Sequence, residues 1–121
     1  MARIDYVTPE TIPEAAKETF AKLAPLNIFR MMAHSGKMLG HYTRLGNCIL
    51  SKSKLDPILR EIAILRVGYI SKATYETFQH ERIGCDVGMS DDLIARVKQG
   101  PDAGGFTQLE QLVMKFTDDV V

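Results

Sequence analysis

The chain contains 121 residues, of which 45% are hydrophobic and 25% are charged. This balance is typical of a folded globular protein and argues against a disordered or fibrous one. Fifteen lysine and arginine residues offset fifteen acidic residues. Because nucleic-acid-binding proteins normally carry a basic excess, we expect no nucleic-acid partner. Charges interrupt every apolar run, so we also expect no membrane-spanning segment.

The sequence predicts a reduced, cytoplasmic protein. The N-terminal segment Met1-Ala2-Arg3-Ile4-Asp5-Tyr6 is too polar for a secretory signal peptide. Two cysteines, Cys48 and Cys85, are too few for a disulfide framework. At this length a chain buries only about two-thirds of its unfolded surface, which favours association of several copies.

Capping residues and helix breakers divide the chain into helical segments. Thr11 and Glu14 have the spacing of a capping box, Pro25 should end the helix that follows, and Gly88 suits a left-handed helix end. A second capping box is formed by Thr107 and Glu110. The segments that we expect, in chain order, are 11–24, 28–33, 35–52, 56–71, 73–87, 90–100 and 107–121. The other predicted N-terminal caps are Asn27, Ser35, Asp56 and Ser90.

These segments predict an all-α fold. The chain has no Asn-Gly or Asp-Gly hairpin turn and no long stretch of strict apolar–polar alternation. We expect about six or seven helices in a single domain over residues 1–121. Within it, residues 1–40 form lead-in helices and residues 41–121 form the core.

The segment 56–71 places charges on a helix that is apolar nearly all round, as buried helices are. Arg66 projects into the middle of its broad apolar face and Glu61 lies at the edge of that face, while Arg60 lies on the opposite side, where we expect more water. Buried charges are costly unless they are paired. Two accounts fit Glu61 and Arg66: internal ion pairs with another helix, or a carboxylate and a guanidinium that line a pocket.

The segment 73–87 carries Glu76 and His80 four residues apart, which makes them neighbours on the helix surface. A carboxylate beside an imidazole can fix its tautomer and favour its protonated form, as a general acid/base requires. An ordinary helical Glu–His pair has the same spacing. The small neighbours Ala73 and Gly84 leave room for a ligand. His34 and His41 lack a metal-binding spacing, so we expect no metal site.

Two motifs resemble the carboxymuconolactone decarboxylase family. The first is Arg60-Glu61-Ile62-Ala63-Ile64-Leu65-Arg66-Val67-Gly68, and the second is Tyr75-Glu76-Thr77-Phe78-Gln79-His80, followed by Gly88-Met89-Ser90. The resemblance extends from about His41 to Ala95. It implies an all-α domain of the alkyl hydroperoxidase D-like type that forms a homotrimer or homohexamer, with its site between the two motif helices.

The resemblance further implies a cofactor-independent carboxy-lyase that acts on a small carboxylated lactone in aromatic-compound degradation. In this interpretation His80 transfers the proton, Glu76 sets its protonation, and Glu61 approaches from the neighbouring helix. Arg66 binds a carboxylate of the substrate, since a guanidinium can grip it with two donors, and Tyr75 contributes to substrate binding.

Two alternatives stay open. The hydroperoxidase branch of the superfamily has a peroxiredoxin-type activity that needs a Cys-x-x-Cys pair, but its two cysteine positions fall on Ala73 and Glu76 here. Dithiol chemistry requires an attacking and a resolving thiol, which disfavours this activity. The third possibility is a non-catalytic oligomer that binds a small carboxylate.

Overall fold

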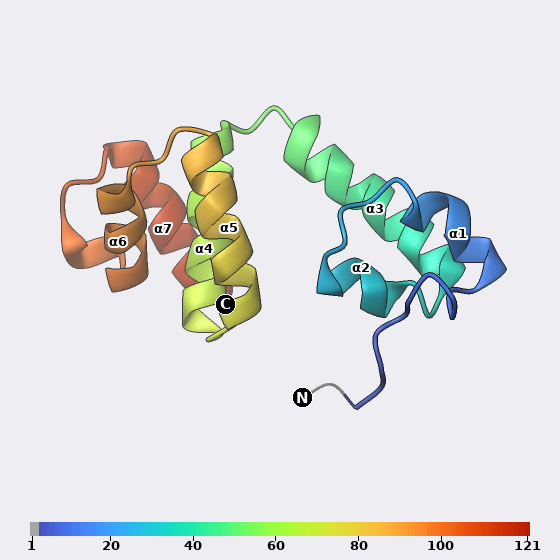
Figure 1. The fold of residues 1–121 in the computed structure, drawn as a ribbon. Helices are drawn as coiled ribbons and strands as arrows, with labels where there is room; N and C mark the ends of the chain where they lie inside the picture. The colour runs from blue at the N-terminus through green and yellow to red at the C-terminus, as the bar shows by residue number, and fades with distance from the viewer. Residues whose placement is uncertain (1–2) are drawn as a thin grey trace. The chain divides into compact units, whose positions relative to one another are not determined.

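The structure, a computed structural model, describes residues 3–121, and its secondary structure in that range is entirely helical, which confirms the predicted all-α class. Among the described residues no helix is long and hydrophobic enough to cross a lipid bilayer. The elements are α1 (Glu14–Phe20), α2 (Asn27–Met32), α3 (Gly36–Ser51), α4 (Pro57–Ile70), α5 (Thr74–Asp86), α6 (Asp91–Gln99), the short 3-10 helix η1 (Pro101–Ala103) and α7 (Gln108–Val120) (Figure 1).

The chain divides into two compact units, Met1–Ser53 and Lys54–Val121. This division follows the end of α3. The boundary that we expected between lead-in helices and core, at residues 40 and 41, falls inside that helix instead.

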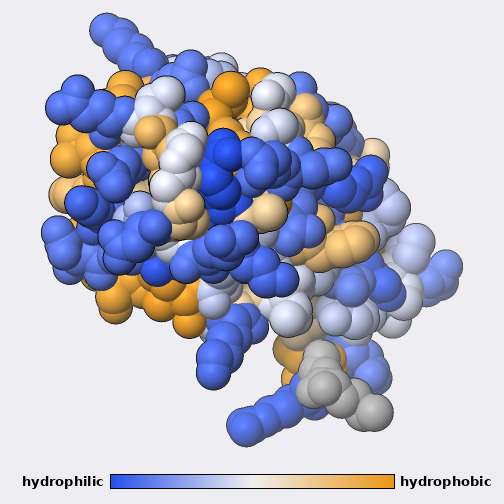
Figure 2. All heavy atoms as spheres, turned by 90° about the vertical axis from the view of Figure 1, so that its left-hand side faces the viewer, coloured by the Kyte–Doolittle hydropathy of each residue, from blue (hydrophilic) through white to orange (hydrophobic). Residues whose placement is uncertain are grey.

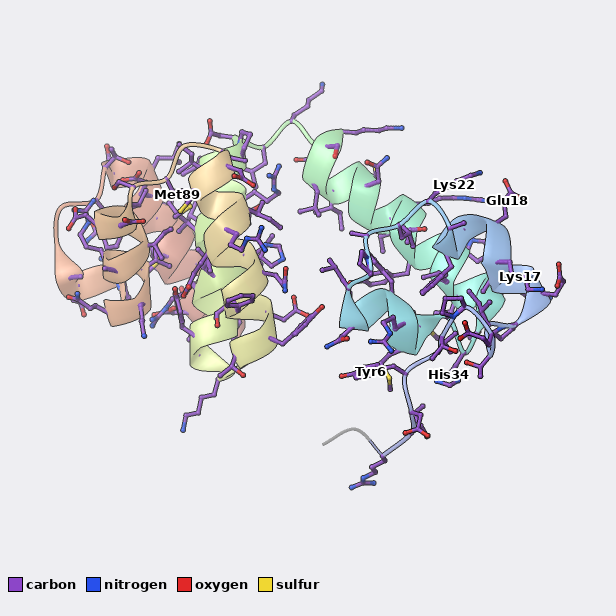
Figure 3. All side chains as sticks on the ribbon, in the orientation of Figure 1. Tyr6, Lys17, Glu18, Lys22, His34 and Met89 are labelled. Carbon is purple, nitrogen blue, oxygen red and sulfur yellow. The ribbon has the colours of Figure 1, made fainter. Side chains whose placement is uncertain are left out.

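The first unit packs α1 and α2 against α3 around a small apolar core. Gly36 permits the close approach of α3 to α1, because a Cβ atom at this position would lie 2.8 Å from the backbone of Ala15. Lys17 and Glu18 on α1, and Lys22 in the turn that follows it, project into solvent (Figure 3). The buried side chains of this core are Val7, Ile12, Ala16, Ala33 and Leu39.

The second unit is built around α4, which contacts α5, α6 and α7. Met89, in the turn between α5 and α6, packs into this core (Figure 3), and its Sδ atom would lie 3.0 Å from a Cβ added at Gly84. The buried apolar side chains are Leu59, Ile62, Leu65, Met89, Leu93, Ile94, Val97 and Met114. Helix α4 therefore carries part of its length, including Arg60 and Glu61, into the centre of this unit.

Three of the predicted caps in the second unit are confirmed. Asp56 accepts hydrogen bonds from the amides of Ile58 and Leu59, and Ser90 accepts one from the amide of Leu93. Both bonds of the capping box between Thr107 and Glu110 are present. Gly88 has a φ of +104°, the positive value expected of a helix-ending glycine.

The predictions for α1 were wrong at both ends. Its N-cap is Pro13, and the hydroxyl of Thr11 instead accepts a hydrogen bond from the amide of Thr8. The helix ends at Phe20 rather than just before Pro25, because the backbone tightens into turns that let Phe20 and Leu23 pack on the core. Two further caps were also wrong. Asn27 is the first residue of α2, with Leu26 as its N-cap, and Ser35 makes no side-chain capping bond.

Candidate functional site

The side chain of Glu61 is the most deeply buried charge of the site, with an exposed fraction of 0%. Its Oε2 atom accepts a hydrogen bond of 2.7 Å from Nδ1 of His80, and its Oε1 atom accepts one of 2.9 Å from Nε of Arg60. Burial raises the pKa of Glu61, but the hydrogen bonds from His80 and Arg60 outweigh it and hold this pKa below its ordinary value. The carboxylate is therefore ionised at neutral pH.

The hydrogen bond to Glu61 fixes which nitrogen of His80 carries a proton. An ionised carboxylate can only accept, so the proton of the neutral imidazole lies on Nδ1. The other nitrogen, Nε2, lies 3.9 Å from Oε2 of Glu76. The side chain of His80 is 14% exposed and that of Glu76 is 47% exposed. The arrangement thus leads from a buried carboxylate, through an imidazole, to a carboxylate at the surface.

The contact between α4 and α5 that joins Glu61 to His80 depends on Gly68. A Cβ atom at this position would lie 2.8 Å from the methyl group of Thr77 on α5. The two helices are connected by a short turn in which Lys72 has a φ of +54°. Close packing near this turn holds α4 and α5 together, so that Glu61 and His80 can form a direct hydrogen bond.

A hollow of about 300 Å³ adjoins the surface end of the arrangement. Its lining combines apolar and small residues with one carboxylate, so it suits a small molecule with an apolar body. Glu76 belongs both to this lining and to the pair with His80. The lining residues are Ile64, Val67, Gly68, Ser71, Ala73 and Glu76.

The prediction that Arg60 lies on a wetter side of its helix was wrong. The residue is 8% exposed and donates from Nε to Glu61. The guanidinium is buried because it bonds to the buried carboxylate of Glu61, while Val67 on the same side of α4 stays 39% exposed. The sequence signal for this contact is the adjacency of an arginine and a glutamate on a helix that is apolar all round.

The structure places Arg66 apart from this arrangement. Its Nε and Nη2 atoms donate to the two carboxylate oxygens of Asp118 on α7, at 2.5 and 2.8 Å. The bond to Asp118 raises the pKa of Arg66, so the guanidinium stays charged. Within residues 3–121, none of the hydrogen bonds or ion pairs of Arg66 involves Glu61, Glu76 or His80. Of the two accounts that the sequence left open, an ion pair with another helix describes Arg66.

The remaining predicted residues lie near the site or outside it. Tyr75 is partly buried and precedes Glu76 in the first turn of α5. Both cysteines are free thiols. Cys48 belongs to the first unit, and Cys85 lies 3.9 Å from a carboxylate oxygen of Asp91. Neither thiol contributes to the pair of Glu61 and His80.

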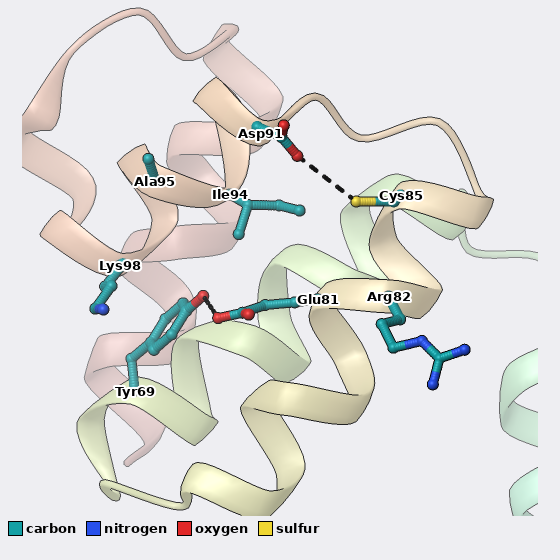
Figure 4. A pocket seen from close by; sticks show the side chains of 8 residues that line it. All are labelled: Tyr69, Glu81, Arg82, Cys85, Asp91, Ile94, Ala95 and Lys98. Atoms are coloured by element: carbon teal, nitrogen blue, oxygen red, sulfur yellow. Dashed lines mark hydrogen bonds between the residues drawn. The ribbon is translucent and has the colours of Figure 1, made fainter.

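A second hollow, of about 380 Å³, lies between α4, α5 and α6 (Figure 4). The hydroxyl of Tyr69 donates a hydrogen bond of 2.8 Å to Glu81 there, and Nζ of Lys98 lies 5.9 Å from the centre of the tyrosine ring. Burial and the neighbouring carboxylate raise the pKa of Tyr69, which keeps its phenol protonated. The α5 residues that line this hollow, Glu81, Arg82 and Cys85, lie on a different side of the helix from Glu76 and His80.

Within the described part of the chain, no group of three or more histidine, cysteine or acidic side chains is arranged to hold a metal ion. No family model, curated protein or solved structure matches the chain.

Proposed function

We propose that this protein is a cytoplasmic, cofactor-independent decarboxylase-like lyase that acts on a small carboxylated lactone as a homotrimer or homohexamer. The observation that carries the proposal is the hydrogen bond from Nδ1 of His80 to the fully buried carboxylate of Glu61. This bond leaves Nε2 of His80 beside Glu76, at the rim of an apolar hollow. The same residues carry the motifs that resemble the carboxymuconolactone decarboxylase family.

The chemistry requires a proton donor. Decarboxylation breaks the bond between the lactone and its carboxyl carbon, releases carbon dioxide and leaves an electron pair that is delocalised in the lactone. This pair must then take up a proton to give the enol-lactone. Protonated His80 supplies this proton from Nε2, Glu61 stabilises the positive charge of the imidazolium, and solvent restores the proton through the exposed side of Glu76.

The substrate also requires a cation for a carboxylate that is not lost. Arg66 is already held by Asp118, so substrate binding there would require an exchange of partners. Arg60 is the guanidinium that is joined to the site, and its bond to Glu61 uses the Nε–H group. A guanidinium carries four further N–H donors. We therefore propose Arg60 as the cation nearest the site, with Tyr75 beside Glu76 on α5.

Hydroperoxidase activity is disfavoured by the same geometry. Ala73 and Glu76, which occupy the positions of its cysteine pair, both line the hollow. Cys85 lies beside Asp91 instead. Alkylation of both thiols should therefore leave turnover unchanged, and loss of turnover on alkylation would contradict the decarboxylase proposal.

The decisive experiment is incubation of the purified protein with 4-carboxymuconolactone while the ultraviolet absorbance of the lactone is followed. The wild type should turn it over, and His80→Gln should lower kcat by about 100-fold or more. His41→Gln, a change at an exposed histidine of α3, serves as the matched control and should keep full activity. Full turnover by His80→Gln would overturn the proposed role of His80. Lactone binding without turnover would instead support the non-catalytic carboxylate-binding protein.

A further inference from the structure

Helix α3 exposes a row of apolar side chains that its own unit does not cover. Met38, Tyr42, Leu45 and Ile49 recur at intervals of four, three and four residues, which places them on one face of the helix. All four are exposed, with Leu45 at 60%. Leu39, on another side of the same helix, is fully buried in the core of the first unit. We call the exposed row the α3 ridge.

The second unit carries an apolar groove between α4 and α7, of about 460 Å³. Thr117 also lines this groove. Its hydroxyl donates a hydrogen bond to the carbonyl of Val113, so that donor is already satisfied within the helix. Phe116 on its rim is 67% exposed. We call this hollow the α4–α7 groove. Its other lining residues are Leu55, which precedes α4, Ala63, Ile64 and Val67 of α4, and Val113 and Val120 of α7.

Exposure on this scale marks an interaction surface. Soluble monomers rarely leave a large contiguous apolar patch open to water. Hydrophobic side chains reach the surface at several places on the face drawn in Figure 2. An apolar groove between two helices commonly binds the apolar face of a third helix. The α3 ridge has the matching form, a single helical row.

Charge complementarity identifies where such a helix comes from. Residues 1–53 contain seven lysine and arginine residues against four acidic ones, and residues 54–121 contain eight against eleven. The two units therefore carry formal net charges of +3 and −3. Helix α3 itself carries Lys37 and Arg44 and no acidic residue, whereas α7 carries three acidic residues, Asp119 next to Val120 of the groove among them, against the single basic residue Lys115. Because the two units have opposite net charges, the first unit of one chain is attracted to the second unit of another copy, whereas two first units or two second units repel each other.

We propose that the α3 ridge of one copy of this chain binds in the α4–α7 groove of a second copy. Each copy supplies one ridge and one groove, so the contact can repeat until it closes into a symmetric pair or ring. Ile64 and Val67 also line the hollow that contains Glu76. A bound ridge would thus border the candidate site. The inference does not depend on the proposed reaction, since association is measured without substrate.

Analytical ultracentrifugation over a wide range of protein concentration tests the contact with two charge variants. Leu45→Asp places a charge on the ridge and leaves the groove intact. Phe116→Asp places a charge in the groove and leaves the ridge intact. The wild type should associate, and each variant alone should be monomeric. An equimolar mixture should regain association, because the intact ridge of one variant meets the intact groove of the other.

Phe78→Asp is the matched control, since Phe78 is an exposed aromatic side chain on α5 outside both surfaces. It should associate like the wild type, and all variants should keep the helical circular dichroism of the wild type. A wild type that stays monomeric at every concentration would overturn the proposal. So would a mixture that stays monomeric, because a contact between two ridges or two grooves cannot be restored by mixing. Dissociation of the control would also overturn it.

Discussion

Glu61 and His80, nineteen residues apart on two helices, share a hydrogen bond of 2.7 Å between Oε2 and Nδ1. The same carboxylate is bonded to Arg60 through its other oxygen. The buried carboxylate of Glu61 therefore bonds to both Arg60 and His80. Its removal should affect the packing of α4 on α5 and the tautomer of the imidazole.

The first prediction concerns the free energy of unfolding. Glu61→Gln keeps the shape of the side chain but leaves the buried guanidinium of Arg60 without its counter-ion. We expect a loss of about 3–5 kcal/mol in urea-induced unfolding, the usual cost of breaking a buried ion pair from one side. The double variant Arg60→Met/Glu61→Gln should recover much of this loss, since it removes both charges. A cost below about 1 kcal/mol for Glu61→Gln, as at exposed ion pairs, would contradict this account.

The second prediction concerns pH. The pKa of Glu61 in the folded protein lies below the ordinary value of 4.5, so near and below that pH the unfolded state binds more protons than the folded state. The contribution of Glu61 is fully present above pH 4.5 and is lost as the pH falls through the folded pKa. The free energy of unfolding should thus decrease on acidification. Glu61→Gln should show a shallower decrease, and equal slopes in the two proteins would refute the assignment.

The third prediction separates a structural role of Arg66 from a substrate-binding one. Asp118→Asn weakens the two charge-assisted bonds to Arg66 and should cost about 1.5–3 kcal/mol of stability. The KM for the lactone should stay unchanged, because the ion pair joins α4 to α7 outside the arrangement around His80. Asp119→Asn, an exposed neighbour, is the control and should change stability by less than about 0.5 kcal/mol. A lower KM in Asp118→Asn would indicate that the released guanidinium binds substrate.

The fourth prediction concerns the contact of α4 with α5. Gly68→Ala places a methyl group 2.8 Å from Cγ2 of Thr77, and this overpacking should cost about 1–3 kcal/mol and lower turnover. Thr77→Ser removes that Cγ2 atom and keeps the hydroxyl that bonds to the carbonyl of Thr74. Combined with Gly68→Ala, it should restore both properties. Gly46→Ala is the control, because a Cβ atom there meets nothing within 4 Å. It should stabilise the protein by up to about 1 kcal/mol.

The sequence predicted the second unit better than the first. Helix α4 begins with an aspartate and a proline, and α7 begins with a capping box, so local chemistry alone defines where these helices start. The end of α1 is decided instead by tertiary contacts of Phe20 and Leu23. Such contacts join residues far apart in the chain and leave no local signal.

The candidate site divides in a similar way. The pair of Glu76 and His80 follows from helical spacing, which any single helix displays. The bond between Glu61 and His80 depends on how closely two helices approach, and the approach depends on a glycine opposite a threonine methyl group. The partners of Arg60 and Arg66 depend on how completely α4 is covered. Periodicity shows that this helix is apolar all round but does not show which neighbour faces each charge.

The five residues between α3 and α4 have a practical consequence for handling the protein. Lys52 and Lys54 lie there, exposed and outside any helix, where a protease finds its backbone most accessible. Trypsin should cut at these lysines before it cuts within the helices. A cut after Lys52 would give two fragments with formal net charges of +3 and −3, and a cut after Lys54 would give +4 and −4, although the intact chain carries none. A protein that binds weakly to either type of ion exchanger at neutral pH would yield one fragment retained by a cation exchanger and one retained by an anion exchanger.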